Sequence, residues 1–461
     1  MSQNSVTPVS LGTDRLSKLL VRYAIPAIVA TVTSALYNIT DSIFIGQGVG
    51  PLAMSGLGIC MPIMSITAAF GSMVGVGGSA LTSIRLGQGN KASAFRILGN
   101  VVLLNIIFGV VTMVACLLFL NKLLYLFGAS ADTIGYAREY MVVLLAGNVV
   151  THLYLGLNEI LRASGYPSKS MMVMLTAVVI NCILDPLFIF VFKWGIAGSA
   201  YATVIAQCTA LAVEIVHFSS PKHFLHFRRS IFKLRRQITF KVLSIGAAPF
   251  LLQACASLVS SINNNALRTH GGDLYIGAFS IINRVMMLFV MIVAGLNQGM
   301  QPIIGYNYGA KLYDRVFKVL KMVIMCAVTA TTTGFLCAEL FPRQIAAIFG
   351  NTSTEMGQQL IDIAAHGMRI AFLWYPFVGF QIVASNFFQC IGKPYKAIMM
   401  SMTRQVLFLI PLLLFLPDIY GSDGVWMSMP IADCSATIVA TILLFFQIRK
   451  LRRDPASDRS I

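Results

Sequence analysis

The feature that most constrains this 461-residue chain is a series of apolar stretches, each long enough to cross a lipid bilayer as a helix. Only 11% of the residues are charged, against roughly 25% in soluble globular proteins. The chain is therefore predicted to be an all-α polytopic membrane protein. Its twelve transmembrane helices are expected at approximately 19–45, 52–80, 95–119, 136–160, 170–192, 196–218, 240–267, 275–303, 315–340, 364–388, 397–416 and 424–447.

The placement of the basic residues predicts how the chain is oriented in the bilayer. The net charge is +17, and Lys and Arg cluster in every second connection, including residues 15–22, 222–241 and 449–453. This is the positive-inside pattern, which predicts cytoplasmic termini and a multi-pass protein of the cytoplasmic membrane. A nucleic-acid-binding protein would instead concentrate its charge on one soluble face, so no nucleic-acid partner is expected.

The chain shows no signature of catalysis or of a bound cofactor. Its nine cysteines are scattered through apolar segments and form no C-x-x-C pair, which is typical of small buried side chains. No metal-ligand cluster, nucleophile elbow or paired-Asp phosphate motif occurs in the sequence. We therefore expect neither an enzyme nor a cofactor.

The two halves of the sequence repeat each other. Four markers recur at offsets of 220 to 227 residues: Pro26 and Pro249, Gly89 and Gly309, residues 162–169 and 389–396, and Gly198 and Gly424. Six spans per half make the repeat parallel, with a pseudo-two-fold axis along the membrane normal. The sequence thus predicts an N-terminal lobe at 1–218, a basic cytoplasmic linker at 219–240 and a C-terminal lobe at 241–461. Two six-helix bundles that rock about a central cavity would give alternating access.

Asp41 and Asp185 lie inside predicted spans, where a carboxylate is costly and marks an ion or proton pathway. The repeat aligns Asp41 with Asn264, and Asp185 with position 411 or 412, so the acids belong to one half only. Asn181 shares a helix face with Asp185, and Asn38 shares one with Asp41. These oxygen-bearing groups suit Na⁺ or a proton relay.

Other polar residues permit more than one interpretation. An isolated intramembrane Asn or Thr, such as Thr203, is often only an interhelical hydrogen-bond partner. Pro26 could be an ordinary kink or a hinge. Asp433 could form a second polar site or pair with Arg284. Glu214 lies near a span end, where it could reach water.

Three segments carry a family resemblance: ALYNITDSIFIG at 35–46, LRASGYP at 161–167 and GLNQGMQPIIGYNYGA at 295–310. The whole chain resembles the multidrug and toxic compound extrusion (MATE) transporters, in particular their DinF-like, MepA-like bacterial branch. The resemblance implies a two-lobed exporter that exchanges H⁺ or Na⁺ for organic compounds, mostly cationic and amphipathic. It also implies an N-lobe cation site, formed by Asp41, Asn181, Asp185 and Thr203.

The resemblance assigns further roles within the N-lobe. Pro26 matches a proline whose bending has been proposed as the response to cation binding. Tyr37, Tyr140 and Asn158 match polar cavity residues, and Asn38 joins them as a substrate-cavity candidate. The acids that another branch carries in its seventh and tenth helices are absent, since 240–267 and 364–388 contain no Asp or Glu.

The predicted function is therefore a cation-coupled antiporter for small organic cations, acting as a monomer in the lipid bilayer. A lipid-linked oligosaccharide flippase of related fold is the alternative. Its anionic pyrophosphate cargo should need several cavity cations, and only Arg284 and Arg369 lie near mid-span. The sequence leaves open the choice between H⁺ and Na⁺ and the physiological substrate.

Overall fold

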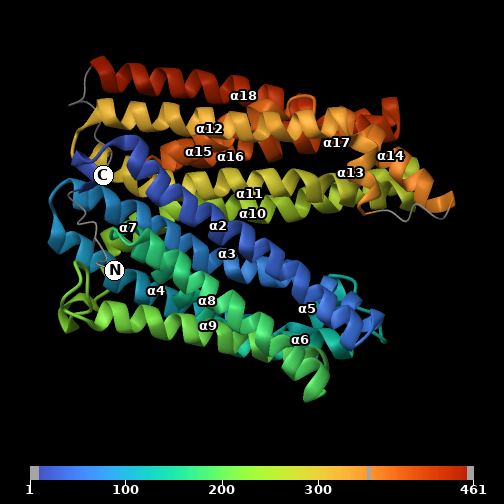
Figure 1. Ribbon diagram of the computed structural model, residues 1–461, viewed down its shortest axis with the longest axis horizontal. Coiled ribbons are helices and arrows are strands. Elements are labelled where there is room, and N and C mark those ends of the chain that lie inside the picture. Colours follow the sequence, from blue (N-terminus) through green and yellow to red (C-terminus); the bar gives the residue numbers. More distant parts are fainter. Residues whose placement is uncertain (1–9, 350–354, 454–461) are drawn as a thin grey trace. The chain divides into compact units, whose positions relative to one another are not determined.

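The computed structural model describes residues 10–349 and 355–453, apart from the side chains of Asn38, Pro51, Ser257 and Asp273. The predicted cavity residue Asn38 therefore lies outside the described side chains. The described chain is helical and contains no β-strand. In chain order, the helices are α1 (Ser10–Thr13), α2 (Leu16–Gly48), α3 (Pro51–Gly87), α4 (Lys91–Leu118), α5 (Leu120–Leu126), α6 (Ile134–Ala146), α7 (Asn148–Ala163), α8 (Pro167–Pro186), η1 (Leu187–Val191), α9 (Gly195–Ser219), η2 (Arg229–Ile231), α10 (Arg236–Gly271), α11 (Asp273–Gly309), α12 (Tyr313–Leu340), α13 (Pro342–Ala347), α14 (Glu355–Ala371), α15 (Tyr375–Cys390), α16 (Pro394–Met402), η3 (Thr403–Leu409), α17 (Ile410–Tyr420) and α18 (Ser422–Arg453) (Figure 1).

The described residues contain ten helices that are long and apolar enough to cross a membrane, or twelve spans if each of two bent helix pairs counts as one. The predicted spans at 136–160 and 364–388 are these pairs. α6 and α7 meet at 55°, and α14 and α15 meet at 57°. Each of these two predicted spans is therefore a bent pair of helices.

Local chemistry explains both bends. At Gly147, between α6 and α7, an added Cβ would lie 2.6 Å from Val204 Cγ2, so glycine permits a close approach to α9. In the second pair, α15 begins at Tyr375, immediately before Pro376. A residue that precedes proline is disfavoured in the α conformation, which favours a break in the helix there. The two halves of the chain are thus interrupted in corresponding spans.

A glycine-mediated crossing between α3 and α11 shows the internal repeat in three dimensions. An added Cβ at Gly87 would lie 2.0 Å from the Tyr306 carbonyl oxygen, and one at Gly309 would lie 2.1 Å from the Ile84 carbonyl oxygen. Tyr306 follows Ile84, and Gly309 follows Gly87, by the same 222 residues. Equivalent residues therefore contact each other reciprocally, at an offset within the range that the sequence predicted.

The chain packs as two compact units. The N-unit contains the chain up to Phe250 together with Gln301–Leu312, and the C-unit contains Leu251–Met300 and the chain from Tyr313 on. Helices α10 and α11 therefore each contribute to both units. The boundary expected in the 219–240 linker stays a prediction.

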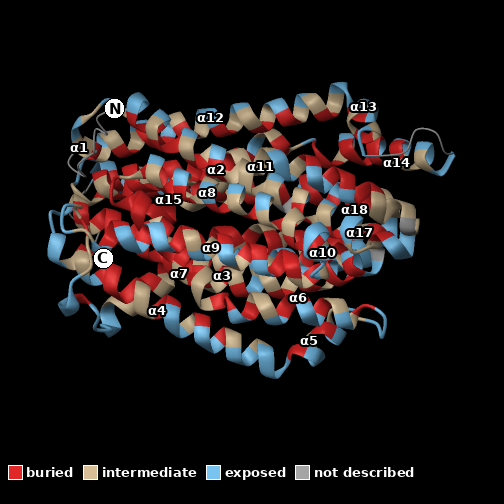
Figure 2. Cartoon of the chain, turned by 60° about the horizontal axis from the view of Figure 1, so that its bottom comes forward, coloured by how far each residue is buried: buried red, intermediate tan, exposed pale blue. Residues whose placement is uncertain are grey.

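Each unit buries its own apolar core and exposes apolar side chains elsewhere. Tyr140 and Ile196 are among the buried residues of an N-unit cluster, and Trp426 belongs to a C-unit cluster. Large apolar side chains such as Val179 and Phe445 are exposed. Buried and exposed residues alternate along the long helices (Figure 2). This pattern is expected where lipid, rather than water, covers the outer helix faces.

Candidate cation site in the N-unit

Three mutually contacting helices of the N-unit, α2, α8 and α9, each contribute two polar side chains to one cluster. Its members are Tyr37 and Asp41 of α2, Asn181 and Asp185 of α8, and Ser199 and Thr203 of α9. The two residues from each helix are four apart, so they share a helix face. Asp41 is 6% exposed and Asp185 is 1% exposed, which places both carboxyl groups out of contact with bulk solvent.

Hydrogen bonds connect the cluster across the three helices. The Ser199 hydroxyl donates to Asp41 Oδ1, and the carboxyl groups of Asp41 and Asp185 lie within hydrogen-bonding reach of each other. On the other side of the cluster, the Tyr37 hydroxyl lies 3.0 Å from Thr203 Oγ1. The two acids therefore share one environment and cannot behave as independent groups.

Asn181 joins the two sides of the cluster through its amide. With its nitrogen toward Asp185, the amide donates to Asp185 Oδ2 at 2.7 Å and accepts from Thr203 Oγ1 at 3.0 Å. With its oxygen toward Asp185, two oxygens would face each other, an arrangement that is favourable only around a positive charge. The orientation with the nitrogen toward Asp185 is therefore the one in which both ends of the amide have partners.

The carboxyl pair is suited to hold one positive charge. An ionised carboxylate only accepts hydrogen bonds, so a hydrogen bond between Asp41 and Asp185 needs a proton. Asp185 Oδ1 is buried and receives no donor from the described residues. The surrounding atoms are carboxylate, hydroxyl and amide oxygens, which also suit a small hard cation. Among the described residues, this site included, no group of three or more His, Cys, Asp or Glu side chains could hold a metal ion.

The structure brings together the four residues that the sequence assigned to the cation site, Asp41, Asn181, Asp185 and Thr203, and adds Tyr37. Tyr140 of α6 is 1% exposed and interacts electrostatically with Asp41 and Tyr37. Sequence reasoning missed Ser199. Its spacing of four residues from Thr203 was the available signal, since it places both hydroxyls on one face of the sixth span.

Asn158 lies in a second buried polar group of the N-unit. Its Nδ2 donates to Glu214 Oε1 at 3.0 Å, and its Oδ1 accepts from the Ser170 hydroxyl at 2.6 Å. Glu214 is fully buried, so the expectation that it could reach water was wrong. The reason is the contact between α7 and α9, which covers the carboxyl group. A role of Asn158 in a substrate cavity stays a prediction.

Pro26 lies within α2, which continues through it from Leu16 to Gly48. Proline removes one hydrogen bond of the helix ladder. One turn later, the Thr31 hydroxyl bonds the carbonyl oxygens of Ala27 and Ile28, both at 3.0 Å. Such back-bonding often bends helices. The segment from Pro26 to Thr31 is therefore the part of α2 best suited to change its curvature.

Some acidic residues outside this cluster form ion pairs with arginine. In the C-unit, Asp433 of α18 accepts from Arg404 Nε of the π-helix η3. The partner is thus Arg404 and not Arg284, the residue that the sequence suggested. Glu159 and Arg162, three residues apart on α7, also form an ion pair.

The fold and the buried acid cluster together define a polytopic helical membrane protein with a candidate cation site. The family model described as MatE matches residues 26–187 and 249–414. The chain therefore belongs to the MatE family, which confirms the resemblance that its motifs carry.

Similar proteins cover nearly the whole chain. Multidrug export protein MepA of Staphylococcus haemolyticus is 26% identical over 445 residues, which are 95% of this chain and 96% of that protein. A multidrug resistance MATE family transporter, solved in an outward-facing conformation, has a TM-score of 0.91 at 24% identity and covers 98% of this chain. All of that transporter's chain is matched. A transporter of the MOP superfamily from Pyrococcus furiosus, whose binding pocket of reverse polarity suggests a different function, has the same TM-score, identity and coverage. These likenesses show a common fold.

Proposed function

We propose that this protein is a cation-coupled multidrug antiporter of the cytoplasmic membrane. It exports small amphipathic organic compounds, mostly cations, in exchange for H⁺ or Na⁺, by alternating access. Family membership and the similarity to multidrug export proteins support the transport of drugs. The observation that carries the coupling is the contact between the buried carboxyl groups of Asp41 and Asp185.

In this proposal, one positive charge binds between Asp41 and Asp185, with Asn181 and Thr203 completing the site. Its departure leaves two carboxylates in contact, and like charges at this separation repel each other strongly in a buried environment. The repulsion is relieved when α2 moves relative to α8, with Pro26 as the hinge. Since Tyr37 of α2 bonds Thr203 of α9, the same movement alters the polar surroundings of Tyr37 and Tyr140, which would receive a substrate. Asn38 and Asn158 stay proposed as further cavity residues.

The decisive test is efflux of a cationic dye from proteoliposomes in which Na⁺ and pH gradients are imposed separately. Asp41→Asn and Asp185→Asn should each abolish dye transport while the protein remains in the membrane. Asp132→Asn makes the same chemical change at an exposed acid of the N-unit and should keep full transport. Full efflux by either buried-site variant would contradict the site. Stimulation by a pH gradient without Na⁺ identifies the proton as the coupling ion.

A lipid-linked oligosaccharide flippase is the second candidate, because a transporter of closely similar fold is associated with a different function. An anionic pyrophosphate needs unpaired cations within the spans, where the sequence offers only Arg284 and Arg369 near mid-span, and Arg404 of the C-unit is already paired with Asp433. This observation favours the drug exporter. Movement of a fluorescent lipid pyrophosphate across the bilayer, without dye efflux, would reverse the preference.

The proposed orientation and oligomeric state can be tested independently of transport. Both termini are expected in the cytoplasm, since both are basic. A reporter that is active only in the cytoplasm should therefore be active when it is fused to either terminus. We propose a monomer, for which light scattering in detergent should give the mass of one chain.

A further inference from the structure

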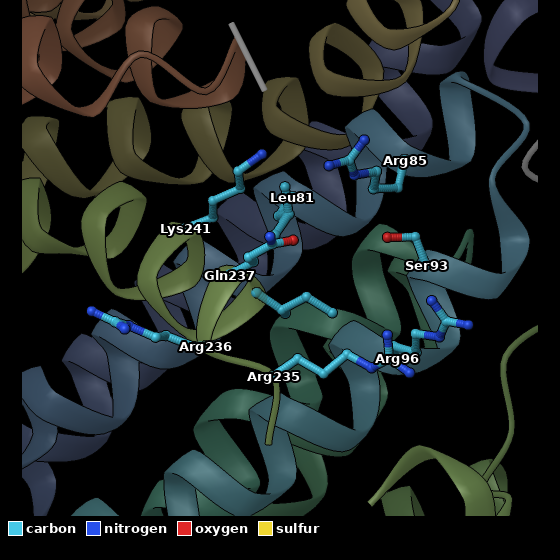
Figure 3. Close-up of a pocket in the computed structure, with 9 residues that line it drawn as sticks. Leu81, Arg85, Ser93, Arg96, Arg235, Arg236, Gln237 and Lys241 are labelled. Atoms are coloured by element: carbon cyan, nitrogen blue, oxygen red, sulfur yellow. The ribbon is translucent and has the colours of Figure 1, made fainter. Parts of the chain in front are cut away.

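A basic pocket of ≈ 360 Å³ lies in the N-unit, away from the candidate cation site. Its charged lining comes from the end of α3, the start of α4 and the start of α10 (Figure 3). These are the ends of three candidate membrane spans, Leu52–Gly87, Lys91–Leu118 and Arg236–Gly271. The polar lining includes Arg85, Ser93, Arg96, Arg235, Arg236 and Lys241. The pocket thus lies where helices leave the apolar part of a bilayer.

The charges of this basic pocket are not balanced by its own lining. Five of the lining residues are Lys or Arg and none is Asp or Glu. Figure 3 shows the side chain of Arg235, the residue before α10, extending toward Arg96 of α4. Arg85 and Lys241 also interact as like charges. Bringing these cations together is unfavourable unless an anion lies among them.

One buried donor of the pocket is available to an anion. Arg85 Nε is buried and has no hydrogen-bond partner among the described residues, whereas Arg85 Nη1 donates to Gln88 Oε1 at 2.9 Å. Ser93 lies in the first turn of the 28-residue helix α4, whose amino end carries a partial positive charge and is capped by Asn90, which accepts from the Ser93 backbone N–H at 2.9 Å. A buried donor without a partner is costly, so a ligand oxygen at this position would be stabilising.

Backbone contacts hold the walls of the pocket in place. The buried Asn100 of α4 donates from Nδ2 to the Lys233 carbonyl oxygen at 3.2 Å and accepts from the Arg235 backbone N–H at 2.9 Å. At Gly99, an added Cβ would lie 2.2 Å from the Ile231 carbonyl oxygen. The segment before α10 is therefore held against α4, which fixes the backbone positions of Arg235 and Arg236.

We propose that this pocket binds the phosphate group of an anionic ligand, with the headgroup of an anionic phospholipid as one source and soluble phosphate as the other. Arginine binds phosphate oxygens through its forked donors, and basic pockets between membrane helices recognise anionic headgroups. The bound phosphate would join α3, α4 and the start of α10 within the N-unit. This inference goes beyond the transport function and does not depend on it.

The test is a binding measurement on the full-length protein in neutral detergent, read out by native mass spectrometry and by the melting temperature. The probes are short-chain phosphatidylglycerol, diacylglycerol with the same chains, and inorganic phosphate. The pocket variant carries Arg85→Gln, Arg96→Gln and Arg235→Gln. The matched control carries Lys222→Gln, Arg229→Gln and Lys233→Gln, which remove the same charge from exposed positions of the adjoining linker.

Phosphatidylglycerol should bind the parent protein, and the pocket variant should bind it about tenfold or more weakly, while the control stays within about twofold of the parent. Diacylglycerol should show no such difference. If inorganic phosphate binds as well as the lipid, and its binding is also lost in the pocket variant, then soluble phosphate is the source of the bound group. Equal loss in both triple variants, or no pocket-dependent binding of either phosphate probe, overturns the proposal. If the triple variant does not fold, the exposed single change Arg96→Glu replaces it, with the same expected loss and Lys233→Glu as its control.

Discussion

The hydroxyl of Ser199 offers the sharpest test of how the buried acid pair works. It donates to Asp41 Oδ1 and lies within hydrogen-bonding reach of Asp185. The change Ser199→Ala removes this donor and fits the space, because alanine is the smaller residue. In the cation-free state the donor stabilises negative charge on the carboxyl pair. We therefore expect the variant to hold its coupling cation more tightly than the parent protein.

The size of the effect follows from the chemistry of the bond. A hydrogen bond to a charged group contributes about 1.5 to 3 kcal/mol. A difference of about 1.4 kcal/mol corresponds to a tenfold change in an equilibrium constant. The cation concentration for half-maximal transport should thus fall about tenfold or more. The maximal rate should also fall, because a cation that binds more tightly leaves more slowly.

The measurement is the initial rate of dye efflux from proteoliposomes as a function of the concentration of whichever cation drives transport. Thr209→Val is the matched control, because it removes an exposed hydroxyl of the same helix α9 that bonds only the Ile205 carbonyl oxygen, at 3.0 Å. An unchanged half-maximal concentration would show that Ser199 does not act on the acid pair. An increase would show that the Ser199 oxygen is a ligand of the cation, and would refute its role as a donor that stabilises the empty site.

Three further predictions concern stability. Gly77→Ala would put a Cβ 2.0 Å from a backbone carbonyl oxygen of α10, and should lower the free energy of unfolding by about 1 to 3 kcal/mol; Gly58→Ala, on the same helix with open space around it, should leave the melting temperature unchanged or slightly higher. Asp433→Asn should lower the free energy of unfolding by about 3 kcal/mol, because it leaves the charge of Arg404 without its partner. The double variant Arg404→Met with Asp433→Leu should recover most of this stability when both variants are compared by denaturation. Burial and the charge of a nearby lysine lower the pKa of His223, so the unfolded chain binds more protons and stability falls as the pH drops through about 6.5. His223→Gln should therefore show a smaller loss of melting temperature between about pH 7.5 and 5.5 than the parent.

The transmembrane helices and the internal repeat were predictable because their signals are local. Hydropathy over a window of about 20 residues identifies a span regardless of its neighbours, and repeated markers such as Pro26 and Pro249 need only be compared along the chain. The two acids were predictable for the same kind of reason, since a carboxylate inside an apolar segment is costly wherever its partners lie. The bend before α15 also had a local signal, Pro376, which hydropathy alone did not reveal.

The partners of these residues were not predictable, because they come from distant parts of the chain. Ser199 is separated from Asp41 by 158 residues, and Asn158 from Glu214 by 56. Which polar residue of one helix meets which of another depends on how the helices are rotated, and a rotation of one residue changes the face by about 100°. A hydroxyl such as that of Ser199 is also cheap to bury alone, so its position carries little information in the sequence.

The difference between the two units is best explained by where each keeps its positive charge. The repeat aligns Asp433 of α18 with Gln207 of α9, so both units have a polar residue at this level of their last span. In the C-unit the acid is neutralised by Arg404, a cation that the chain itself supplies. In the described N-unit no ion pair involves Asp41 or Asp185. The acid pair of the N-unit has no cation among the described residues of the protein and must take a neutralising cation from solution. Asp433 of the C-unit has Arg404 and needs none. This asymmetry supports the proposal that the C-unit keeps a structural charge pair while the N-unit holds an exchangeable cation that is coupled to transport.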